Sequence, residues 1–321
     1  MTSHENFDAR PRVKHHRLNI LPENPEQNIP EDKAVGPGRF PSWLHRKLPQ
    51  GTNLWKTGDL LSKNRLHTVC EEARCPNLLE CWSKKTATFL VMGKECTRNC
   101  GFCDIDFSKA PKGLEADEPA RVADSVQQLG LKHVVITMVA RDDLEDGGAA
   151  HLAEVIRETR KVNPSATIEV LTSDFSGNLE ALDIVLEAKP DIFNHNIETV
   201  RDLTPRVRHK ATYERSMRIL KHVKDNSSVI TKSGIMVGLG ETTAQVEEAL
   251  NDLHHIGVSI VTMGQYLQPN PHKLLVKSFV TPEQFKEYEL YGRSIGITNM
   301  YCGPFVRSSY NAAEVFQNIQ P

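Results

Sequence analysis

The sequence predicts an α/β protein in which parallel strands form one sheet and helices cover it. Six apolar segments of strand length recur between residues 85 and 300, and helical segments separate them. The expected strands are residues 86–93, 133–139, 167–173, 191–198, 231–239 and 259–267. Regular alternation of strand and helix specifies a parallel sheet. The expected strands are almost continuously apolar, which is typical of a sheet that is buried on both faces.

The predicted helices carry start and stop signals. Residues 117–130 begin with acidic residues and Pro119, a residue that suits the first turn of a helix. In residues 242–257, Thr242 stands three positions before Gln245, which is the spacing of a capping box. A glycine in the left-handed conformation is expected to end three of the helices, at Gly130, Gly257 and Gly296.

Six strand–helix units are two fewer than a closed (β/α)8 barrel contains, so an open, partial barrel fits the count. A doubly wound sheet fits the same pattern nearly as well, and in both folds ligands bind where the strands end. Extensions are expected on both sides of this core. The expected division is an irregular N-terminal arm, a cysteine-bearing segment, the barrel and a C-terminal segment, at residues 1–50, 51–84, 85–300 and 301–321.

Composition excludes several classes of function. The 321-residue chain has a formal net charge of −2, which gives no electrostatic footprint for nucleic acid or an anionic membrane. No apolar run approaches the roughly 18 residues of a membrane-spanning helix. The first residues lack the apolar core of a signal peptide. We therefore expect a cytoplasmic protein that binds neither nucleic acid nor membrane.

Six of the seven cysteines lie between residues 70 and 103, and such clustering indicates metal or redox chemistry. Cys96, Cys100 and Cys103 follow the first strand with the spacing C-x3-C-x2-C. Thiolates at this spacing can reach one soft metal or one cluster. A 4Fe–4S cluster usually takes four thiolates, so three leave one iron open for a small molecule. A structural zinc site would need a fourth cysteine or histidine, and none follows in the loop.

A second triad precedes the first strand. Cys70, Cys75 and Cys81 have the spacing C-x4-C-x5-C, which lies outside the usual short zinc knuckles. Zinc remains an alternative on spacing alone. Beside the other triad, a second cluster is the better interpretation.

The C-x3-C-x2-C motif, with Phe102 before its last cysteine, resembles that of the radical S-adenosylmethionine (SAM) superfamily. The resemblance implies a partial (β/α)6 barrel of the TIM type. It also implies that the open iron chelates the amino and carboxylate groups of SAM. An electron then cleaves SAM to methionine and a 5′-deoxyadenosyl radical.

The C-x4-C-x5-C spacing, together with Arg-Ser-Ser-Tyr at residues 307–310, resembles the lipoyl synthase family. The likeness covers about residues 50–312 and includes the segments TATFLVMG, HVVIT, RDDLEDGGAAH, DIFNHNIETV, TKSGIMVGLGE and GQYLQP. It implies a sulfurtransferase that uses two 4Fe–4S clusters and SAM. Sulfur from the auxiliary cluster is inserted at C6 and C8 of an octanoyl group on a lysine, the last step of lipoate biosynthesis.

The resemblance also implies partners. The octanoyl group is carried by a lipoyl carrier domain, either the E2 subunit of a 2-oxoacid dehydrogenase or the H protein of glycine cleavage. An electron donor of the ferredoxin or flavodoxin type is expected. The acyl chain needs an apolar channel, and radical chemistry needs a site that excludes water.

The auxiliary triad lacks a fourth ligand, and two residues are candidates. Chemistry alone nominates Cys302, because sulfur is a softer ligand than a hydroxyl group. The resemblance nominates Ser309, the second serine of the Arg-Ser-Ser-Tyr segment, which we prefer. The C-terminal segment would then close over the auxiliary cluster, and Cys302 would be a buried small hydrophobe.

Two further polar residues are candidates for binding SAM. The twofold period of a strand places Asn196 and Glu198 on one side of residues 191–198. Polar groups at a strand end inside a parallel core are costly unless they bind something. The segment resembles the SAM-contact region of the family. Structural hydrogen bonding within the barrel is the alternative.

Three positions depart from the family pattern: Ala140, Arg208-His209-Lys210-Ala211, and residues 270–276. We expect none of them to touch a cluster ligand. Other functions stay open at this point. They are a different radical SAM enzyme with an auxiliary cluster, a non-catalytic iron–sulfur electron carrier, and a binding module held together by zinc.

Overall fold

The structure is a computed structural model that describes residues 40–45 and 53–312. Its contacts divide the chain into the units Met1–Phe40 and Pro41–Pro321, and the elements below belong to the second unit. The predicted N-terminal arm, residues 1–50, lies outside the described residues except for residues 40–45. These contain one short 3-10 helix, η1 (Ser42–Leu44). Among the described helices, none is long and apolar enough to cross a membrane.

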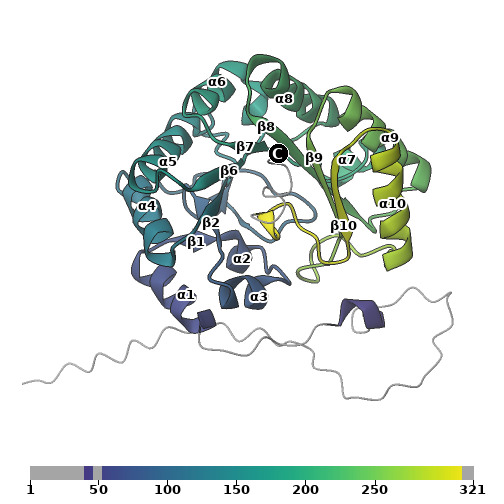
Figure 1. Cartoon of the computed structure of the whole chain (residues 1–321), viewed down its shortest axis with the longest axis horizontal. Helices are drawn as coiled ribbons and strands as arrows, with labels where there is room; N and C mark the ends of the chain where they lie inside the picture. Colours follow the sequence, from purple (N-terminus) through teal and green to yellow (C-terminus); the bar gives the residue numbers. More distant parts are fainter. Residues whose placement is uncertain (1–39, 46–52, 313–321) are drawn as a thin grey trace, which may run out of the picture. The chain divides into compact units, whose positions relative to one another are not determined.

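An eight-stranded sheet forms the centre of the described part (Figure 1). Its order is β1-β2-β5-β6-β7-β8-β9-β10. The strands are β1 (His67–Thr68), β2 (Thr88–Val91), β5 (His133–Met138), β6 (Thr167–Leu171), β7 (Ile192–Asn194), β8 (Ile230–Val237), β9 (Ile260–Gln265) and β10 (Asn299–Gly303). β1 pairs antiparallel with β2, and all later neighbours pair parallel. The mostly parallel, open sheet confirms the partial barrel.

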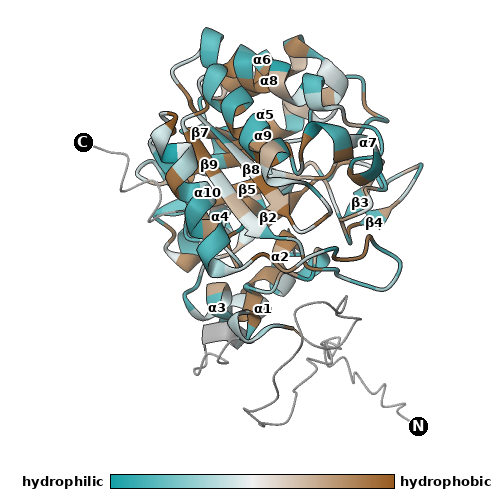
Figure 2. Ribbon diagram, turned by 90° about the vertical axis from the view of Figure 1, so that its right-hand side faces the viewer, coloured by the Kyte–Doolittle hydropathy of each residue, from teal (hydrophilic) through white to brown (hydrophobic). Residues whose placement is uncertain are grey.

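Helices cover the outside of this sheet in Figure 1. They are α4 (Glu118–Leu129), α5 (Ala149–Val162), α6 (Leu179–Glu187), α8 (Tyr213–Asn226), α9 (Thr243–His255) and α10 (Pro282–Ser294). The remaining helical pieces are α1 (Asn53–Lys63), α2 (Val69–Glu72), α3 (Leu78–Ser83), η2 (Phe175–Gly177), η3 (Arg201–Leu203) and α7 (Thr204–Val207). In Figure 2 the strands are largely brown and the helices alternate between brown and teal, as expected for amphipathic helices on an apolar sheet.

The predicted helix signals are confirmed. α9 begins with a capping box in which Thr242 accepts a hydrogen bond from the Gln245 N–H and the Gln245 side chain accepts one in return. Gly130, Gly257 and Gly296 all have positive φ, of 68°, 80° and 110°. Glycine adopts this conformation without steric cost, so each helix can stop where the next strand begins.

The structure adds to the eight-stranded sheet one parallel strand that the sequence did not predict. β10 pairs with β9, with Asn299 opposite Ile260 and Gly303 opposite Gly264. Its sequence, Asn-Met-Tyr-Cys-Gly, has asparagine and glycine at its ends, and both residues are rare in strands. Pairing with β9 therefore decides its conformation. The expected boundary between residues 300 and 301 falls inside this strand.

The inner face of the barrel carries a buried ion pair. Ile168 and Val170 on β6 pack in the outer core, so Glu169 between them points to the opposite face. The Lys232 ammonium lies 2.9 Å from Glu169 Oε1, and both side chains are 0% exposed. Asn194 donates a hydrogen bond of 3.0 Å to the same oxygen. Burial alone would raise the pKa of Glu169, but Lys232 and His133 lower it overall.

The opposite side of the β7 end holds a buried histidine. His195 is 1% exposed, with Nδ1 3.0 Å from the Thr172 carbonyl oxygen and Nε2 3.0 Å from Ser216 Oγ. Burial, and then the charge of Arg208, lower the pKa of His195 to about 4. The ring therefore stays neutral at pH 7 and ties β7 to α8.

Replacing Glu169 by glutamine is expected to lower the free energy of unfolding by about 3–5 kcal/mol, because Lys232 keeps a buried charge without its carboxylate. The double variant Glu169→Gln/Lys232→Met should recover most of the loss. Urea unfolding measures both changes. A double variant as unstable as the single one would show that the charge of Lys232 is not the cause.

Stability is expected to fall with acid because His195 titrates differently in the two states. Its folded-state pKa, about 4, lies below the ordinary 6.5, so the unfolded chain takes up the proton first. The contribution of neutral His195 to the free energy of unfolding is complete above pH 6.5. It is lost as the pH falls towards 4, and the loss amounts to up to about 3 kcal/mol. Urea unfolding at pH 7.5, 6 and 5 measures how steeply the free energy of unfolding changes with pH. If the free energy of unfolding depended on pH equally in the wild type and in His195→Gln, this account would be contradicted.

Candidate cluster-binding sites

The second cysteine triad lies on a loop at the C-terminal edge of the sheet. We call residues 96–103 the cysteine loop. It lies between β3 (Glu95–Cys96) and β4 (Asp106–Phe107), which pair only with each other. Neighbouring segments hold its backbone. The Thr97 N–H donates to the Ala140 carbonyl (3.0 Å), and the Gly101 N–H donates to the Val207 carbonyl (3.0 Å).

The three thiols of this loop lie close enough to affect one another. Burial, and then the neighbouring Cys100 and Cys96, raise the pKa of Cys103 to about 12. Burial raises the pKa of Cys100 as well; Arg208 opposes the rise, and Cys96 and Glu198 add to it. Three half-buried thiolates so close together would repel one another unless a cationic group lay among them. The donor set therefore fits an iron–sulfur cluster.

The first triad lies on two short helices below β2. Cys70 is on α2 and Cys81 on α3, and the Cys75 N–H between them donates to the Cys70 carbonyl (3.0 Å). Burial raises the pKa of Cys70 strongly, and Cys75 and Cys81 add to the rise. All seven cysteines lie in the described residues and none of them forms a disulfide, so each triad can supply three sulfur ligands.

Neither triad is arranged around a single ion. In residues 40–45 and 53–312, no three His, Cys, Asp or Glu side chains converge closely enough to hold one metal ion. In a 4Fe–4S cube each thiolate binds a different iron. Its ligands therefore stand farther apart than the four ligands of a structural zinc.

A segment after β10 contacts the helix that carries Cys81, at its start and in its first turn. Asn77 donates to the Phe305 carbonyl oxygen (2.8 Å), and the Tyr310 hydroxyl donates to Glu80 Oε1 (3.0 Å). Asn77 caps α3 and Glu80 is in its first turn, so both contacts are made on the helix that carries Cys81.

Gly264 permits this crossing, because a Cβ there would collide with the Val306 carbonyl oxygen. The close approach explains a glycine in the middle of β9. Residues 304–310 thus pass over the C-terminal edge of the sheet and reach α3.

The structure separates the two candidates for the fourth ligand. Cys302 packs in the outer core with α9 and α10, and the pKa of its thiol is raised by burial and then by Glu289 on α10. Ser309 directly precedes Tyr310, whose hydroxyl contacts α3. The cysteine therefore faces the helical layer, whereas the serine belongs to the segment that reaches the first triad.

Asn196 and Glu198 lie at the same edge, just beyond β7. The Glu198 N–H donates to the Gly234 carbonyl (3.1 Å), and Glu198 has a positive φ of 65°. Asn196 Nδ2 donates to Glu198 Oε1 and to Ser308 Oγ, both at 3.2 Å. A Cβ at Gly234 would lie 2.7 Å from Asn196 Oδ1, so glycine is needed there.

Each of these two side chains has a polar group that its neighbours in the structure do not fully stabilise. Asn196 Oδ1 is buried and accepts no hydrogen bond from any of the residues that the structure describes. Burial raises the pKa of Glu198, although Arg208, Asn196 and Arg307 oppose the rise. Glu198 in turn raises the pKa of Cys100 and Cys103, so it lies near the second triad. Such a buried acceptor without a partner is unusual unless a ligand supplies the donor.

The three departures from the family pattern, at Ala140, residues 208–211 and residues 270–276, all contact the cysteine loop. The His209 N–H is hydrogen-bonded to the Cys100 sulfur, and Lys273 Nζ donates to the Cys100 carbonyl oxygen (3.4 Å). The expectation that none of them touches a cluster ligand is therefore wrong. Ala140 contacts the loop through its backbone, because its carbonyl oxygen accepts hydrogen bonds from the N–H and the hydroxyl of Thr97.

Sequence reasoning missed Arg98, which lies between two of the cysteines. Its side chain pairs with Asp142 and Asp174 in two other loops. The only local signal was the position of Arg98 between Cys96 and Cys100, two of the predicted cluster ligands. Its partners become neighbours only when the sheet forms.

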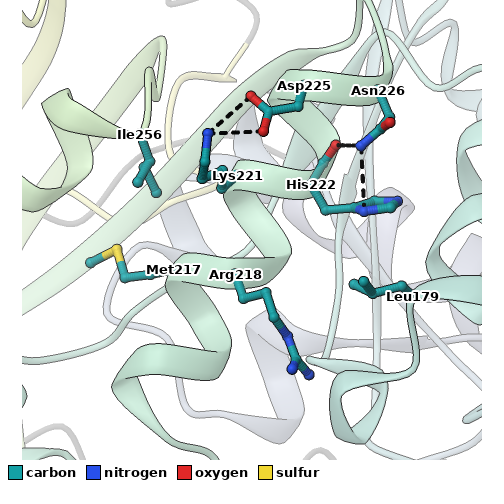
Figure 3. Close-up of a pocket in the computed structure, with 8 residues that line it drawn as sticks. All are labelled: Leu179, Met217, Arg218, Lys221, His222, Asp225, Asn226 and Ile256. Carbon is teal, nitrogen blue, oxygen red and sulfur yellow. Dashed lines mark hydrogen bonds and ion pairs between the residues drawn. The ribbon is translucent and has the colours of Figure 1, made fainter.

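A surface cavity of about 360 Å3 lies away from both triads, between helices of the outer layer (Figure 3). It is lined by Leu179, Met217, Arg218, Lys221, His222, Asp225, Asn226 and Ile256. Lys221 pairs with Asp225, and Asn226 donates to His222. Arg218 donates to the Gly177 carbonyl oxygen, and His222 also contacts Asp183. None of the predicted site residues lines the cavity.

Comparison with known proteins identifies the family. Residues 90–253 match the radical SAM superfamily, and residues 14–75 match the N-terminal domain of lipoyl synthase of the radical SAM family. A lipoyl synthase of Protochlamydia amoebophila is 70% identical over 302 residues, which are 93% of each chain. One from Chlamydia trachomatis serovar A is 53% identical over 293 residues, which are 91% of this chain and 94% of the other.

Two solved structures share the fold at low identity. Streptococcus suis SuiB bound to S-adenosylmethionine has a TM-score of 0.52 and 12% identity, and the match covers 71% of this chain and 54% of that one. Methylornithine synthase (PylB) has a TM-score of 0.51 and 13% identity, with 79% and 83% covered. The chain belongs to the lipoyl synthase family of radical SAM enzymes.

Proposed function

We propose that this chain inserts two sulfur atoms at C6 and C8 of a protein-bound octanoyl-lysine to give lipoyl-lysine, the last step of lipoate biosynthesis. One observation carries the proposal. The segment after β10 contacts both candidate sites, through Tyr310 and Glu80 on one side and Ser308 and Asn196 on the other. A reaction that needs a radical at one site and sulfur from the other requires such closeness.

Each triad is assigned its own group. Cys96, Cys100 and Cys103 hold the 4Fe–4S cluster that binds SAM. Cys70, Cys75 and Cys81, with Ser309, hold the auxiliary cluster. When bound, the first with SAM supplies a radical that abstracts hydrogen, and the second supplies sulfur, as the family resemblance implies.

The fourth ligand is assigned to Ser309 rather than Cys302. The outward orientation of Cys302, towards Glu289 on α10, supports this choice. The contact between Tyr310 and the helix of Cys81 supports it from the other side. A hydroxyl oxygen binds iron less firmly than a thiolate does, which suits a cluster that must give up sulfur.

Asn196 and Glu198 are assigned to SAM binding. The unpartnered Oδ1 of Asn196 can accept an N–H of the ligand, and the carboxylate of Glu198 can accept a hydrogen bond from the amino group that the open iron binds. A small apolar cluster beside the cysteine loop excludes water. Its members are Phe102, Leu203, Val207, Met236, Leu239, Tyr266, Leu274 and Val276.

The substrate is an octanoyl group attached to a protein. The finer assignments are a lipoyl carrier domain, from an E2 subunit or the glycine cleavage H protein, and an electron donor of the ferredoxin or flavodoxin type. A cytoplasmic location is proposed with them. The absence of a disulfide among the seven described cysteines supports it, because that compartment keeps cysteines reduced.

Activity is tested with anaerobically reconstituted protein, SAM, a strong reductant and an octanoyl-lysine peptide. Mass spectrometry is expected to show 5′-deoxyadenosine and a peptide that has gained two sulfur atoms. Changing Cys100 to Ala should abolish both products, because SAM loses its cluster. Release of 5′-deoxyadenosine with no sulfur in the peptide would leave a radical SAM enzyme of another kind.

The fourth ligand is tested by counting iron in Cys302→Ala and Ser309→Ala. In a background that lacks Cys96, Cys100 and Cys103, only the auxiliary site can bind a cluster. Ser309→Ala is expected to lose part of this iron or to change its absorption spectrum, because a coordination bond is removed. Cys302→Ala should behave like its parent. Loss of the cluster only in the Cys302 variant would overturn the assignment.

A further inference from the structure

Arg98 is the one charged residue between Cys96 and Cys100, and its side chain is only 5% exposed. Its Nε and Nη2 donate to the two oxygens of Asp142, at 2.9 and 2.7 Å. The same Nη2 lies 2.6 Å from Asp174 Oδ1. A bidentate carboxylate and a second acid hold the planar guanidinium in one orientation, which a flexible ammonium does not match.

The two carboxylates come from different loops of the barrel. Asp142 lies after β5, and Asp174 lies after β6, where its side chain is 0% exposed. Asp174 also pairs with Arg215 on α8, at 3.1 Å. Ser176 Oγ donates to Asp142 (3.0 Å). The guanidinium therefore joins the loop after β2 to the loops after β5 and β6, and through them to the outer helices.

Thr97 makes a second link to the same place. Its hydroxyl donates to the Ala140 carbonyl oxygen (3.0 Å) and accepts from the Asp142 N–H (2.9 Å). The Arg98 N–H lies 3.4 Å from Cys96 Sγ. Residues 97 and 98 thus connect the end of β5 directly to the first thiol of the triad.

The cysteine loop has little structure of its own to hold it. Its flanking strands, β3 and β4, are two residues long and pair only with each other. Two-stranded pairs of this size are not stable alone. The loop must present three thiols at fixed separations, so its geometry depends on anchors outside it.

We propose that Arg98 is a positioning residue that fixes the cysteine loop, through Asp142 and Asp174, so that its three thiols meet one cluster. The inference rests on the proposed assignment of Cys96, Cys100 and Cys103 to the SAM-binding cluster. The auxiliary triad has separate anchors, since α2 is capped by Thr68 and α3 contacts residues 304–310. Loss of Arg98 therefore impairs one cluster and spares the other.

The test uses the full chain with Cys70, Cys75 and Cys81 changed to Ala, so that bound iron reports the second triad alone. Arg98→Met and Arg98→Lys are made in this background and reconstituted anaerobically. The parent is expected to bind about four irons per chain. Arg98→Met should bind less than half as much, and the EPR spectrum of its reduced cluster should no longer change when SAM is added.

Arg98→Lys is expected to recover part of the iron and part of the SAM-dependent EPR change, because one ammonium can reach one of the two carboxylates. A merely structural role would not give this graded recovery together with an altered spectrum. Asp142→Asn, at a side chain that is 18% exposed, is expected to act in the same direction as Arg98→Met. It decides the matter if Arg98→Met does not fold.

A matched control lies at the other end of the barrel. Arg160 pairs with Asp191 at 2.6 Å and donates to the Ala166 carbonyl oxygen (2.6 Å). Arg160→Met removes an ion pair of similar length that is more exposed, and it should leave the iron content and the EPR spectrum as in the parent. In the otherwise unchanged chain, Arg98→Met should keep the iron of the auxiliary site, about four per chain.

Normal iron content with a normal SAM response in both Arg98→Met and Asp142→Asn would overturn the inference. Equal loss of iron from both triads would also overturn it, because the effect would then be general instability. A parent that binds no iron at Cys96, Cys100 and Cys103 would instead remove the proposed function itself.

Discussion

Parallel pairing of neighbouring strands, from β2 to β10, is the constraint on which the site depends. Parallel strands all end at the same edge of a sheet, so the loops that follow them meet there. The cysteine loop, Asp142, Asp174 and Glu198 follow four different strands and come together for this reason alone. The buried Glu169–Lys232 pair lies beneath, on the inner face of the same strands, and fills the barrel below the edge.

The sequence was sufficient for features that have a local cause. Helix caps, helix-ending glycines and apolar strands depend on a few neighbouring residues, so Thr242, Gly130 and β5 could be predicted. The cysteine triads could be found for the same reason, since their spacing is local. β10 was missed because its pairing with β9, rather than its own residues, decides its conformation. The Arg98–Asp142 pair spans 44 positions, and no local pattern reveals it.

Two criteria disagree about Cys302 as the fourth ligand of the auxiliary cluster. The softness of its sulfur atom favours it, and its packing opposes it. Sulfur is the better iron ligand, and on that rule alone Cys302 was the natural candidate. On β10, however, Cys302 and Met300 share the face that packs in the outer core with α9 and α10. A strand cannot turn one side chain inward without turning its neighbours outward. A residue can bind the cluster only if its side chain lies on the face that is directed towards the cluster. Packing therefore limits which residues can be ligands, whatever the softness of their donor atoms.

The contact between Tyr310 and Glu80 joins residues that are 230 positions apart. On the ribosome, Glu80 and the six clustered cysteines are made long before Tyr310. The contact therefore cannot form before the chain has been made as far as Tyr310. It is a non-local contact, and the parallel sheet between its two ends must bring residues 304–310 to α3.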